Sequence, residues 1–533
     1  MHSKVRSLES ALAVSLLSIL EVRAFKTPDQ VAFNFHQNQT YTFLELWRGI
    51  CGVGSFLLER GIERQARVLV AIPNSVEFFF AFYGVQRAGG VAVPVFPGLG
   101  AERILTVAGL AEASAVLVSG EFLEEKTVEL CGLANGCGIE VFSVEDCLDS
   151  GVGSNFPEVG EDDVAFIQFT SGSTGDPKGV ELTHRNLVAN MEQMIAGMEI
   201  TAEDSFVSWL PVYHDMGLIL MTMVPFYLGF PLTILPTGLN YLDLWLRTIH
   251  DTKATFTAAP DFAYRLCLLY VKQKEAIDLS SLRVALNAAE PVRATTIRQF
   301  EAAFDIDNVL LPAYGLAEAT VGVCSWKPGH PIKTDDRGSV SVGKPFPGIQ
   351  LKIENKVGEI LIKTMAATRG YFNNPRATEE LFTAEGYLRT GDLGYLDEEG
   401  DLFVVGRKKN IIIQGGRNLS SREIEELVDI FPFVRRSAAV GIDRGRLEGE
   451  QAYIFIEPRL PGKSMEDNNL LEELSIEVVN AFHQSFGFRP GRVLFTKHST
   501  IPITPNGKIQ YQQLKALYLE NSLQDQGLIL FPN

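Results

Sequence analysis

The stretch FTSGSTGDPKGVELTHRNL, residues 169–187, places three glycines, two serines and three threonines around a single lysine, Lys178. Glycine lets the backbone approach a ligand closely, and hydroxyls beside free backbone N–H groups donate hydrogen bonds to anionic oxygens. Lys178 adds a positive charge to the same segment. The loop therefore predicts a phosphate-binding site, against the alternative of a polar surface loop.

The residues on either side of the loop predict its structural context. The apolar run VAFIQFT (residues 164–170) predicts a buried strand, and HRNLVANMEQMIAGM (residues 184–198) has helical spacing, with Thr183 as a candidate N-cap. The pattern indicates a strand–loop–helix unit. It differs from the P-loop of nucleotide triphosphatases, which requires Gly-Lys-Ser/Thr, because Pro177 precedes Lys178 and Gly179 follows it.

The whole chain of 533 residues has the composition of a globular protein, with 46% hydrophobic and 21% charged residues. Its length suggests roughly two to four domains. Lys and Arg number 47 against 65 Asp and Glu, and the net charge of −18 disfavours nucleic acid as a partner. The six cysteines form no CxxC pair and no His–Cys metal spacing, which predicts mostly buried thiols in a reducing compartment and no metal site made by these cysteines.

The sequence predicts a cytoplasmic protein without integral membrane association. Lys4 and Arg6 precede the apolar run ALAVSLLSIL, but Glu9 interrupts this signal-like start and no clean small-residue cleavage site follows. The apolar stretch VEFFFAFYGV (residues 76–85) is followed closely by Arg87 and is too short to span a bilayer.

The order of apolar runs predicts an α/β fold in two domains. Short β-branched or aromatic runs alternate with helical stretches from residue 30 to about residue 316, which favours layered α/β subdomains. Short strands and tight turns after GKPFPG (residues 343–348) indicate a small β-rich subdomain. The composition shifts beyond GRKKN (residues 406–410). We expect a large N-terminal domain at residues 1–408 and a small α+β C-terminal domain at residues 409–533.

Five motifs stand in the same order as in a known superfamily. They are TSGSTGDPKG (170–179), LPVYHDMGL (210–218), the pair NAAEPVR (287–293) and AYGLAEAT (313–320), the long run from RTGD to SREIE (389–425), and ITPNGKIQ (503–510). With them the chain resembles the adenylate-forming acyl and aryl ligases, which include the acyl-CoA synthetases, along nearly its full length. Within that superfamily it looks most like the fatty acyl-AMP ligases.

The resemblance implies a site for ATP and Mg²⁺. The loop would hold the β- and γ-phosphates, through residues Thr170, Ser171, Gly172, Ser173, Thr174, Gly175 and Lys178. Adenine would lie between the residues Ala289, Glu290 and Pro291 on one side and Tyr314, with Gly315, on the other. Glu318 would bind Mg²⁺, Asp392 would accept both ribose hydroxyls, and Arg407 would add a cation to the same nucleotide.

The resemblance also implies roles in acid binding and domain motion. His214, Asp215, Met216 and Gly217 would shape the entrance of the acyl pocket, whose apolar lining would come from the run MGLILMTMVPFYLGFPL (216–232). We expect His214 and Asp215 to point in opposite directions, as neighbours on a strand do, rather than to form a catalytic dyad.

The resemblance implies an N-terminal adenylation domain and a mobile C-terminal domain. Two lysines would act as the enzyme changes from acyl-AMP formation to transfer of the acyl group to a thiol. Lys508 would bridge the acyl carboxylate and the α-phosphate as a catalytic residue, together with Lys178 and Glu318. Lys409 would be the hinge between the domains.

The acceptor of the acyl group is left open by the sequence. Fatty acyl-AMP ligases that serve carrier proteins usually carry an insertion between the glutamate motif and the ribose aspartate, and the segment from Thr320 to Asp392 is short. Acyl-AMP formation followed by transfer to an acyl carrier protein ranks first, and acyl-CoA synthesis from free coenzyme A ranks a close second. An aryl or amino acid substrate, and a non-catalytic adenylate-binding relative, are the remaining alternatives.

Overall fold

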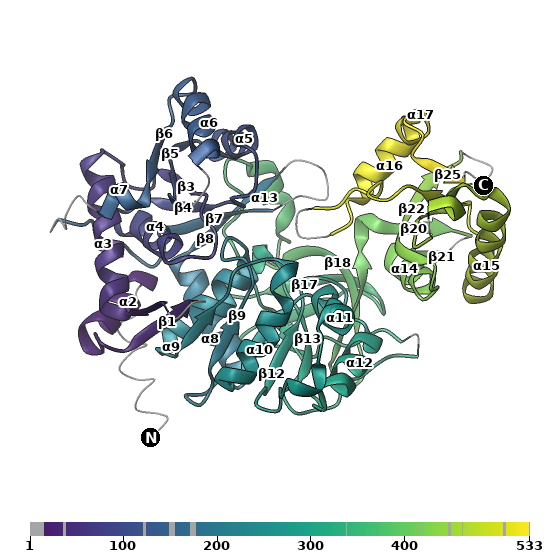
Figure 1. The fold of residues 1–533 in the computed structure, drawn as a ribbon, viewed down its shortest axis with the longest axis horizontal. Helices are drawn as coiled ribbons and strands as arrows, with labels where there is room; N and C mark the ends of the chain where they lie inside the picture. Colours follow the sequence, from purple (N-terminus) through teal and green to yellow (C-terminus); the bar gives the residue numbers. More distant parts are fainter. Residues whose placement is uncertain are drawn as a thin grey trace.

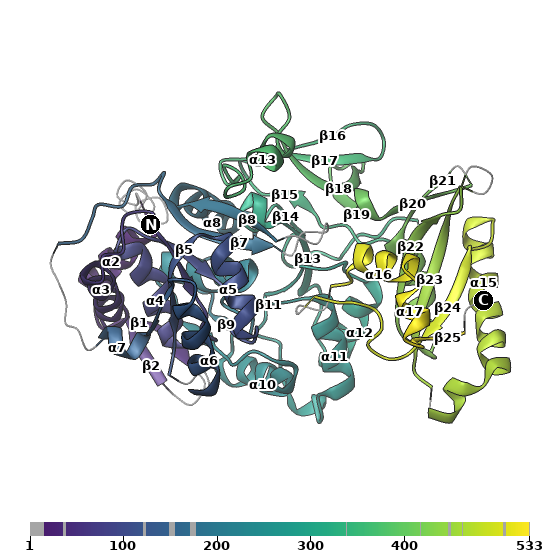
Figure 2. The same ribbon diagram turned by 90° about the horizontal axis from the view of Figure 1, so that it is seen from above.

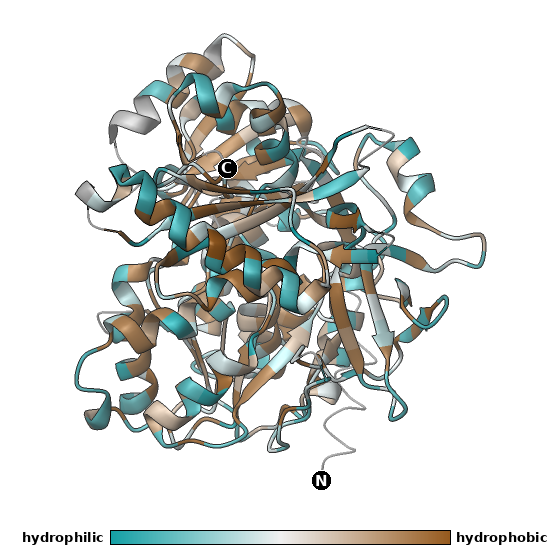
Figure 3. Cartoon of the chain, turned by 90° about the vertical axis from the view of Figure 1, so that its right-hand side faces the viewer, coloured by the Kyte–Doolittle hydropathy of each residue, from teal (hydrophilic) through white to brown (hydrophobic). Residues whose placement is uncertain are grey.

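The computed structural model of the protein describes residues 15–35, 39–120, 124–148, 155–170, 177–336, 338–415, 417–445, 449–460, 462–504 and 508–531. These residues form several sheets covered by helices, and the predicted α/β class is confirmed (Figure 1). The strands are mostly hydrophobic, whereas many helices carry a hydrophilic and a hydrophobic side (Figure 3). The pattern is the one expected for helices packed onto buried sheets.

The first sheet has six strands in the order β6-β5-β3-β4-β7-β8. Their bounds are β3 (Arg67–Val70), β4 (Val91–Pro94), β5 (Ala113–Val118), β6 (Glu140–Ser143), β7 (Val164–Thr170) and β8 (Lys178–Thr183). The accompanying helices are α3 (Phe43–Glu59), α4 (Val76–Arg87), α5 (Ala101–Leu110), α6 (Glu124–Asn135) and α7 (Val144–Leu148). Successive residues of a strand face opposite sides: Val68 packs in the core that includes α3 and α4, and Leu69 packs in the core that includes α5.

The phosphate-loop prediction is correct for the flanking strand and helix and wrong for the connection between them. Strand β7 has the predicted bounds, and helix α8 (His184–Gly197) begins at Thr183, whose hydroxyl accepts from the backbone N–H of Asn186 at 3.2 Å. Residues from Lys178 to Thr183, however, form strand β8, which pairs antiparallel with β7 and sets Thr170 opposite Lys178. The loop therefore joins two strands of a hairpin and does not lead directly into a helix.

The second sheet has nine strands in the order β15-β14-β13-β12-β11-β9-β10-β1-β2. Their bounds are β1 (Val31–Phe35), β2 (Gln39–Thr42), β9 (Phe206–Ser208), β10 (Leu232–Ile234), β11 (Phe256–Ala259), β12 (Val284–Asn287), β13 (Leu310–Tyr314), β14 (Cys324–Ser325) and β15 (Lys344–Pro345). The associated helices are α2 (Leu16–Lys26), η1 (Met216–Met223), α9 (Val224–Leu228), η2 (Leu239–Tyr241), α10 (Leu242–Thr252), α11 (Asp261–Tyr270), η3 (Lys274–Ala276), α12 (Ala294–Phe304) and η4 (Ala317–Ala319). The strands from β1 to β13 in this order run parallel.

A third, antiparallel sheet has the order β16-β17-β18-β19. It contains β16 (Gln350–Ile353), β17 (Gly358–Lys363), β18 (Leu388–Leu396) and β19 (Leu402–Arg407), with α13 (Pro375–Leu381) before β18. This sheet corresponds to the predicted β-rich region. In Figure 2, β18 and β19 lie between the earlier elements and the C-terminal strands.

The remaining elements form a separate α+β unit after the short turn η5 (Lys408–Asn410). Its strands are β20 (Ile411–Gln414), β21 (Arg417–Ser420), β22 (Val434–Asp443), β23 (Glu450–Pro458), β24 (Arg492–Thr496) and β25 (Ile529–Phe531). Its helices are α14 (Ser421–Asp429), η6 (Gly462–Glu466), α15 (Asn468–Phe486), α16 (Tyr511–Leu519) and α17 (Ser522–Asp525). The chain before α16 extends toward the larger part of the molecule (Figure 1).

The buried side chains fall into cores on either side of η5. Within the described chain, two clusters of buried apolar residues include nothing beyond Leu402, and the two others begin at Ile412 and at Ala438. The boundary predicted between residues 408 and 409 falls in this interval.

Candidate active site

Parallel strands of the nine-stranded sheet carry three of the motifs to one edge. Strand β9 ends before the segment with His214, β12 ends at Asn287 before Ala289, and β13 ends with Tyr314. Loops at the carboxyl ends of parallel strands meet at one edge of the sheet, which is where α/β proteins bind ligands. Strand β18 brings Asp392 to Tyr314 from the third sheet.

Asp392 is held by one neighbour on each carboxylate oxygen. The hydroxyl of Tyr314 donates to Oδ2 at 2.7 Å, and Nε of Arg407 lies 2.7 Å from Oδ1. Asp392 is only 5% exposed. Burial raises the pKa of this carboxyl above its usual range, and Arg407 opposes that rise. The arrangement fixes the direction of the carboxylate, as recognition of two vicinal hydroxyls requires.

Glu318 and Lys178 are joined through a residue that the sequence analysis did not identify, Tyr371. Its hydroxyl donates to Oε1 of Glu318 at 2.8 Å, while Nζ of Lys178 lies 4.8 Å from the centre of its ring. Burial, and then the charge of Glu318, raise the pKa of the Tyr371 phenol, so it remains a donor at neutral pH. The sequence RGYFNNP, an aromatic residue between a glycine and a turn, was the available signal.

The predicted adenine segment is anchored from its underside by Asp261, a second residue that the sequence analysis missed. Oδ1 of Asp261 accepts from Nδ2 of Asn287 at 3.0 Å and from the backbone N–H of Arg293 at 3.2 Å. Between these two anchors, Ala289 has a φ of +68°, a left-handed conformation that favours glycine. Asp261 thus holds a strained backbone segment in place.

Three further predicted nucleotide residues lie beside this segment. The carboxylate of Glu290 accepts from the backbone N–H of Phe262, and burial raises its pKa. Pro291 is exposed next to it. Gly315 leaves no room for a side chain, because a Cβ there would lie 1.7 Å from the carbonyl oxygen of Val321. Glu290 therefore has a structural partner, and Gly315 is required by close backbone packing.

His214 and Asp215 face each other, so the predicted opposite orientation is wrong. Nδ1 of His214 lies 2.5 Å from Oδ1 of Asp215, and the same oxygen accepts from the backbone N–H of Met216 at 2.7 Å. The physical reason is the backbone: these residues lead into the π-helix η1 and do not occupy a strand. Burial is the largest single influence on the pKa of Asp215 and raises it, but His214, Lys508 and the N–H of Met216 together lower the pKa further, and the net shift is downward.

The same segment is fixed by close contacts. A Cβ at Gly217 would lie 2.1 Å from the carbonyl oxygen of Pro211. Asn74, also absent from the sequence prediction, accepts from the backbone N–H of Val212 at 2.9 Å and donates to the carbonyl of Leu210 at 2.9 Å. The segment before η1 is therefore rigidly held.

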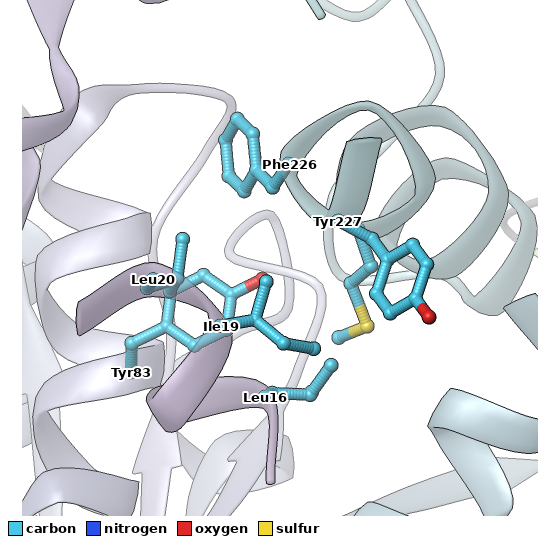
Figure 4. Close-up of a pocket in the computed structure, with 7 residues that line it drawn as sticks. Leu16, Ile19, Leu20, Tyr83, Phe226 and Tyr227 are labelled. Carbon is cyan, nitrogen blue, oxygen red and sulfur yellow. The ribbon is translucent and has the colours of Figure 1, made fainter. Parts of the chain in front are cut away.

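The predicted apolar lining is largely part of the core. All of η1, from Met216 to Met223, is buried. At its far end a small apolar pocket, with a volume of only about 10 Å³, lies between α2, α4 and α9 (Figure 4). Its lining residues are Leu16, Ile19, Leu20, Tyr83, Met223, Phe226 and Tyr227. Helix η1 thus runs from the His214–Asp215 pair to an apolar pocket.

Lys508 is an exposed residue of the C-terminal unit whose charge acts on two of the predicted site residues. Its positive charge lowers the pKa of both Asp215 and Asp392, acting against burial, which raises both, and after the larger effects of His214 and Arg407. The backbone N–H of Lys508 donates to the hydroxyl of Thr504 at 3.1 Å. Lys409 is exposed in η5, between β19 and β20.

Part of the predicted phosphate loop lies outside the described residues, namely Ser171, Gly172, Ser173, Thr174 and Gly175. Thr170 and Lys178, at its two ends, are paired across the β7–β8 hairpin. Within the described ranges, no cluster of three or more His, Cys, Asp or Glu side chains is arranged to bind a metal. No helix in the part of the chain that the structure describes is both long enough and apolar enough to cross a bilayer.

Comparison with known proteins gives relatives along nearly the whole chain. The sequence pattern of the AMP-binding enzymes matches residues 20–372. The medium-chain-fatty-acid–[acyl-carrier-protein] ligase JamA of Moorena producens is 31% identical over 578 aligned positions, covering 96% of this chain and 96% of JamA. The putative fatty-acid–CoA ligase FadD25 of Mycobacterium tuberculosis is 30% identical, covering 96% of this chain and 99% of FadD25.

A solved structure has the same fold. It comes from a study of fatty acyl-adenylate ligases from E. coli and L. pneumophila, with a TM-score of 0.85 and 26% identity over 96% of this chain and 98% of that chain. The match to the family pattern covers well over half of the sequence. The chain therefore belongs to the family of AMP-binding enzymes and is an adenylate-forming ligase.

Proposed function

We propose that the protein activates a medium- or long-chain fatty acid with ATP and Mg²⁺. The acid carboxylate attacks the α-phosphorus of ATP, the bond to the β-phosphate oxygen breaks, and pyrophosphate leaves. The pantetheine thiol of an acyl carrier protein then attacks the acyl carbonyl of the acyl-AMP, and AMP leaves as the thioester forms. The chain would act in the cytoplasm.

The observation that carries this proposal is that the charge of Lys508, from the C-terminal unit, acts on both Asp392 and Asp215, where Tyr314 and Arg407 hold the Asp392 carboxylate from either side. Asp392 would bind ribose, and the Asp215 segment would face the acid. An ammonium group between these two positions can neutralise charge on the acyl carboxylate and the α-phosphate together. If Lys508 were far from either aspartate, its ammonium group could not neutralise the acyl carboxylate and the α-phosphate together.

Glu318 fits a role as a Mg²⁺ ligand. Tyr371 occupies Oε1, and Oε2 makes no hydrogen bond to any residue within the described ranges. A single protein carboxylate suits Mg²⁺, which keeps waters and substrate phosphates in its shell. The bound ion would neutralise phosphate charge, while Lys178 and the loop hold the phosphates. Tyr371 would keep the Glu318 carboxylate turned toward them.

The Asp215 contacts favour a fatty acid over an amino acid. An α-amino group needs a carboxylate that is available to it, and Oδ1 of Asp215 is already engaged by His214 and by the N–H of Met216. The residues that follow Asp215 in η1 are almost all apolar, and a wall of that composition suits an alkyl chain better than an aryl acid or an amino acid.

Free coenzyme A is the second candidate acceptor. The observation that favours it is the short connection from β14 to β18, whose described residues form only β15, β16, β17 and α13 and no long insertion. The relative JamA is named for an acyl carrier protein and FadD25 for coenzyme A.

The test measures pyrophosphate release with octanoate to palmitate, benzoate and amino acids. Release with the fatty acids, followed by a mass increase of a holo carrier protein, supports the proposal. Thioester formation with free coenzyme A alone supports the second candidate. Absence of pyrophosphate release with every acid would instead identify a non-catalytic adenylate-binding relative.

A further inference from the structure

Both ends of one helix of the C-terminal unit, α14, contact the two residues that directly follow the predicted adenine segment, Val292 and Arg293. Near its start, Nη2 of Arg422 donates to the carbonyl of Val292 at 3.1 Å. At its last residue, Oδ2 of Asp429 accepts from Nη2 of Arg293 at 2.8 Å. Arg422 and Asp429 are seven residues apart, so they lie on the same face about two turns apart. Helix α14 is thus bound twice to two consecutive residues of the larger part.

Each of these contacts is backed by a second one. Nη1 of Arg422 also donates to the carbonyl of Val404 in β19 at 3.3 Å. Oδ1 of Asp429 accepts from the hydroxyl of Ser437 at 2.7 Å, which orients its other oxygen toward Arg293. The side chains of Arg293 and Asp429 are 26% and 19% exposed, so their attraction is only partly screened by water.

The same helix is linked to the turn that carries Lys508. Oε1 of Glu425, in the middle of α14, accepts from the backbone N–H of Ala439 at 3.0 Å, and Oε2 accepts from the hydroxyl of Tyr511 at 3.0 Å. Tyr511 begins α16, three residues after Lys508. A path of direct contacts therefore leads from Arg293, beside the adenine segment, through α14 to the position of Lys508.

We propose that Arg293, Asp429 and Arg422 form a latch that holds the C-terminal unit with Lys508 at the active site during adenylation and that opens for thiol transfer. They are positioning residues, because none of them needs to touch the substrate. The proposal rests on the proposed two-step function. The latch contacts are made in the adenylation orientation and not in the thiol-transfer orientation. They therefore raise the population of the first orientation relative to the second and favour the adenylation half-reaction.

The kinetic test uses Arg293→Met and Asp429→Asn, with Arg376→Met as the matched control. Arg376 also forms an ion pair, with Glu380, but it is 90% exposed within α13. We expect pyrophosphate release to fall roughly tenfold or more in both latch variants, as for loss of one charge-assisted hydrogen bond. Acyl transfer from supplied acyl-AMP to the thiol should be unchanged or faster, and the control should match the parent protein. An equal loss in both half-reactions, or no loss in adenylation, would overturn the proposal.

A second measurement is independent of turnover. Spin labels at Glu379→Cys and Glu472→Cys, with the two cysteines that are not buried replaced as Cys131→Ser and Cys137→Ser, report the distance between α13 and α15. We expect one dominant distance in the parent protein and a broader or shifted distribution after Arg293→Met. An unchanged distribution overturns the latch even if the enzyme is active. Failure of the parent protein to release pyrophosphate would refute the proposed function, while the distances would still test the latch.

Discussion

The phenol of Tyr371, which lies in none of the five sequence motifs, donates a hydrogen bond of 2.8 Å to Glu318, which lies in one of them. Tyr371→Phe removes the hydroxyl and retains the ring against which Lys178 lies. We expect pyrophosphate release to need a higher Mg²⁺ concentration and to fall by roughly tenfold, because the carboxylate loses its fixed direction. A Mg²⁺ titration of the rate measures this. Tyr371→Ala should lower the rate of pyrophosphate release further than Tyr371→Phe does. An unchanged Mg²⁺ titration curve for Tyr371→Phe would exclude the positioning role of Tyr371.

Asp392→Ala should weaken the use of nucleotide in both half-reactions. Loss of a charged hydrogen-bond acceptor costs roughly 1.5–3 kcal/mol, or about ten- to a hundredfold in affinity. The variant also leaves Arg407 without its partner carboxylate. The Michaelis constant for ATP and the rate of acyl-AMP consumption report the two steps. Unchanged values for both would contradict ribose binding by Asp392.

Lys508→Ala should separate the two steps. We expect acyl-AMP formation to fall by roughly a hundredfold or more, because a preorganised charge is lost from the reacting groups. Thiol transfer from presynthesised acyl-AMP should survive. If that transfer falls as strongly as adenylation, the alternating-orientation mechanism does not apply to this protein.

Lys409→Pro should give the opposite result. Proline fixes φ and stiffens η5, the connection between β19 and β20. Adenylation should persist in the orientation described above, while thioester formation collapses. Circular dichroism and the thermal unfolding curve verify that the variant is folded. Normal thioester formation by a folded Lys409→Pro protein would rule out a hinge at this residue.

The buried His184 should make stability depend on pH. Burial lowers its pKa from 6.5 to about 4, and its Nδ1 accepts from the backbone N–H of Leu16 at 3.3 Å. Between these two values the unfolded chain binds a proton that the folded chain excludes, so stability is full above about pH 6.5 and falls as pH decreases toward about 4. The loss reaches about 3 kcal/mol. Unfolding in urea at pH 7 and pH 5 measures it, with His184→Gln as the variant that should lose this pH dependence. If the free energy of unfolding changes equally with pH in the parent protein and in His184→Gln, His184 is not the group responsible.

The parts of the fold that the sequence predicted correctly depend on local patterns. The strand at residues 164–170 and the N-cap at Thr183 follow from apolar spacing and from a hydroxyl beside a helix start. Strand β8 was missed because its six residues were taken as the end of a glycine-rich loop. Only pairing with β7 makes those residues extended.

The site residues that were missed act over long separations in the sequence. Tyr371 and Glu318 are 53 residues apart, and Arg293 and Asp429 are 136 residues apart. No local spacing connects such pairs. The facing orientation of His214 and Asp215 was missed for a different reason, because a π-helix start was taken as a strand.

The division of the buried cores at η5 has a consequence for binding strength between the two parts. Neither side contributes buried apolar residues to the core of the other within the described chain, and the contacts of α14 with the larger part are polar. Such contacts would bind two separate polypeptides weakly. The short covalent tether at η5 supplies an effective local concentration on the order of millimolar or above, which is enough for a weak surface to dock and release repeatedly. Cleavage of that tether would therefore remove the docking without unfolding either part.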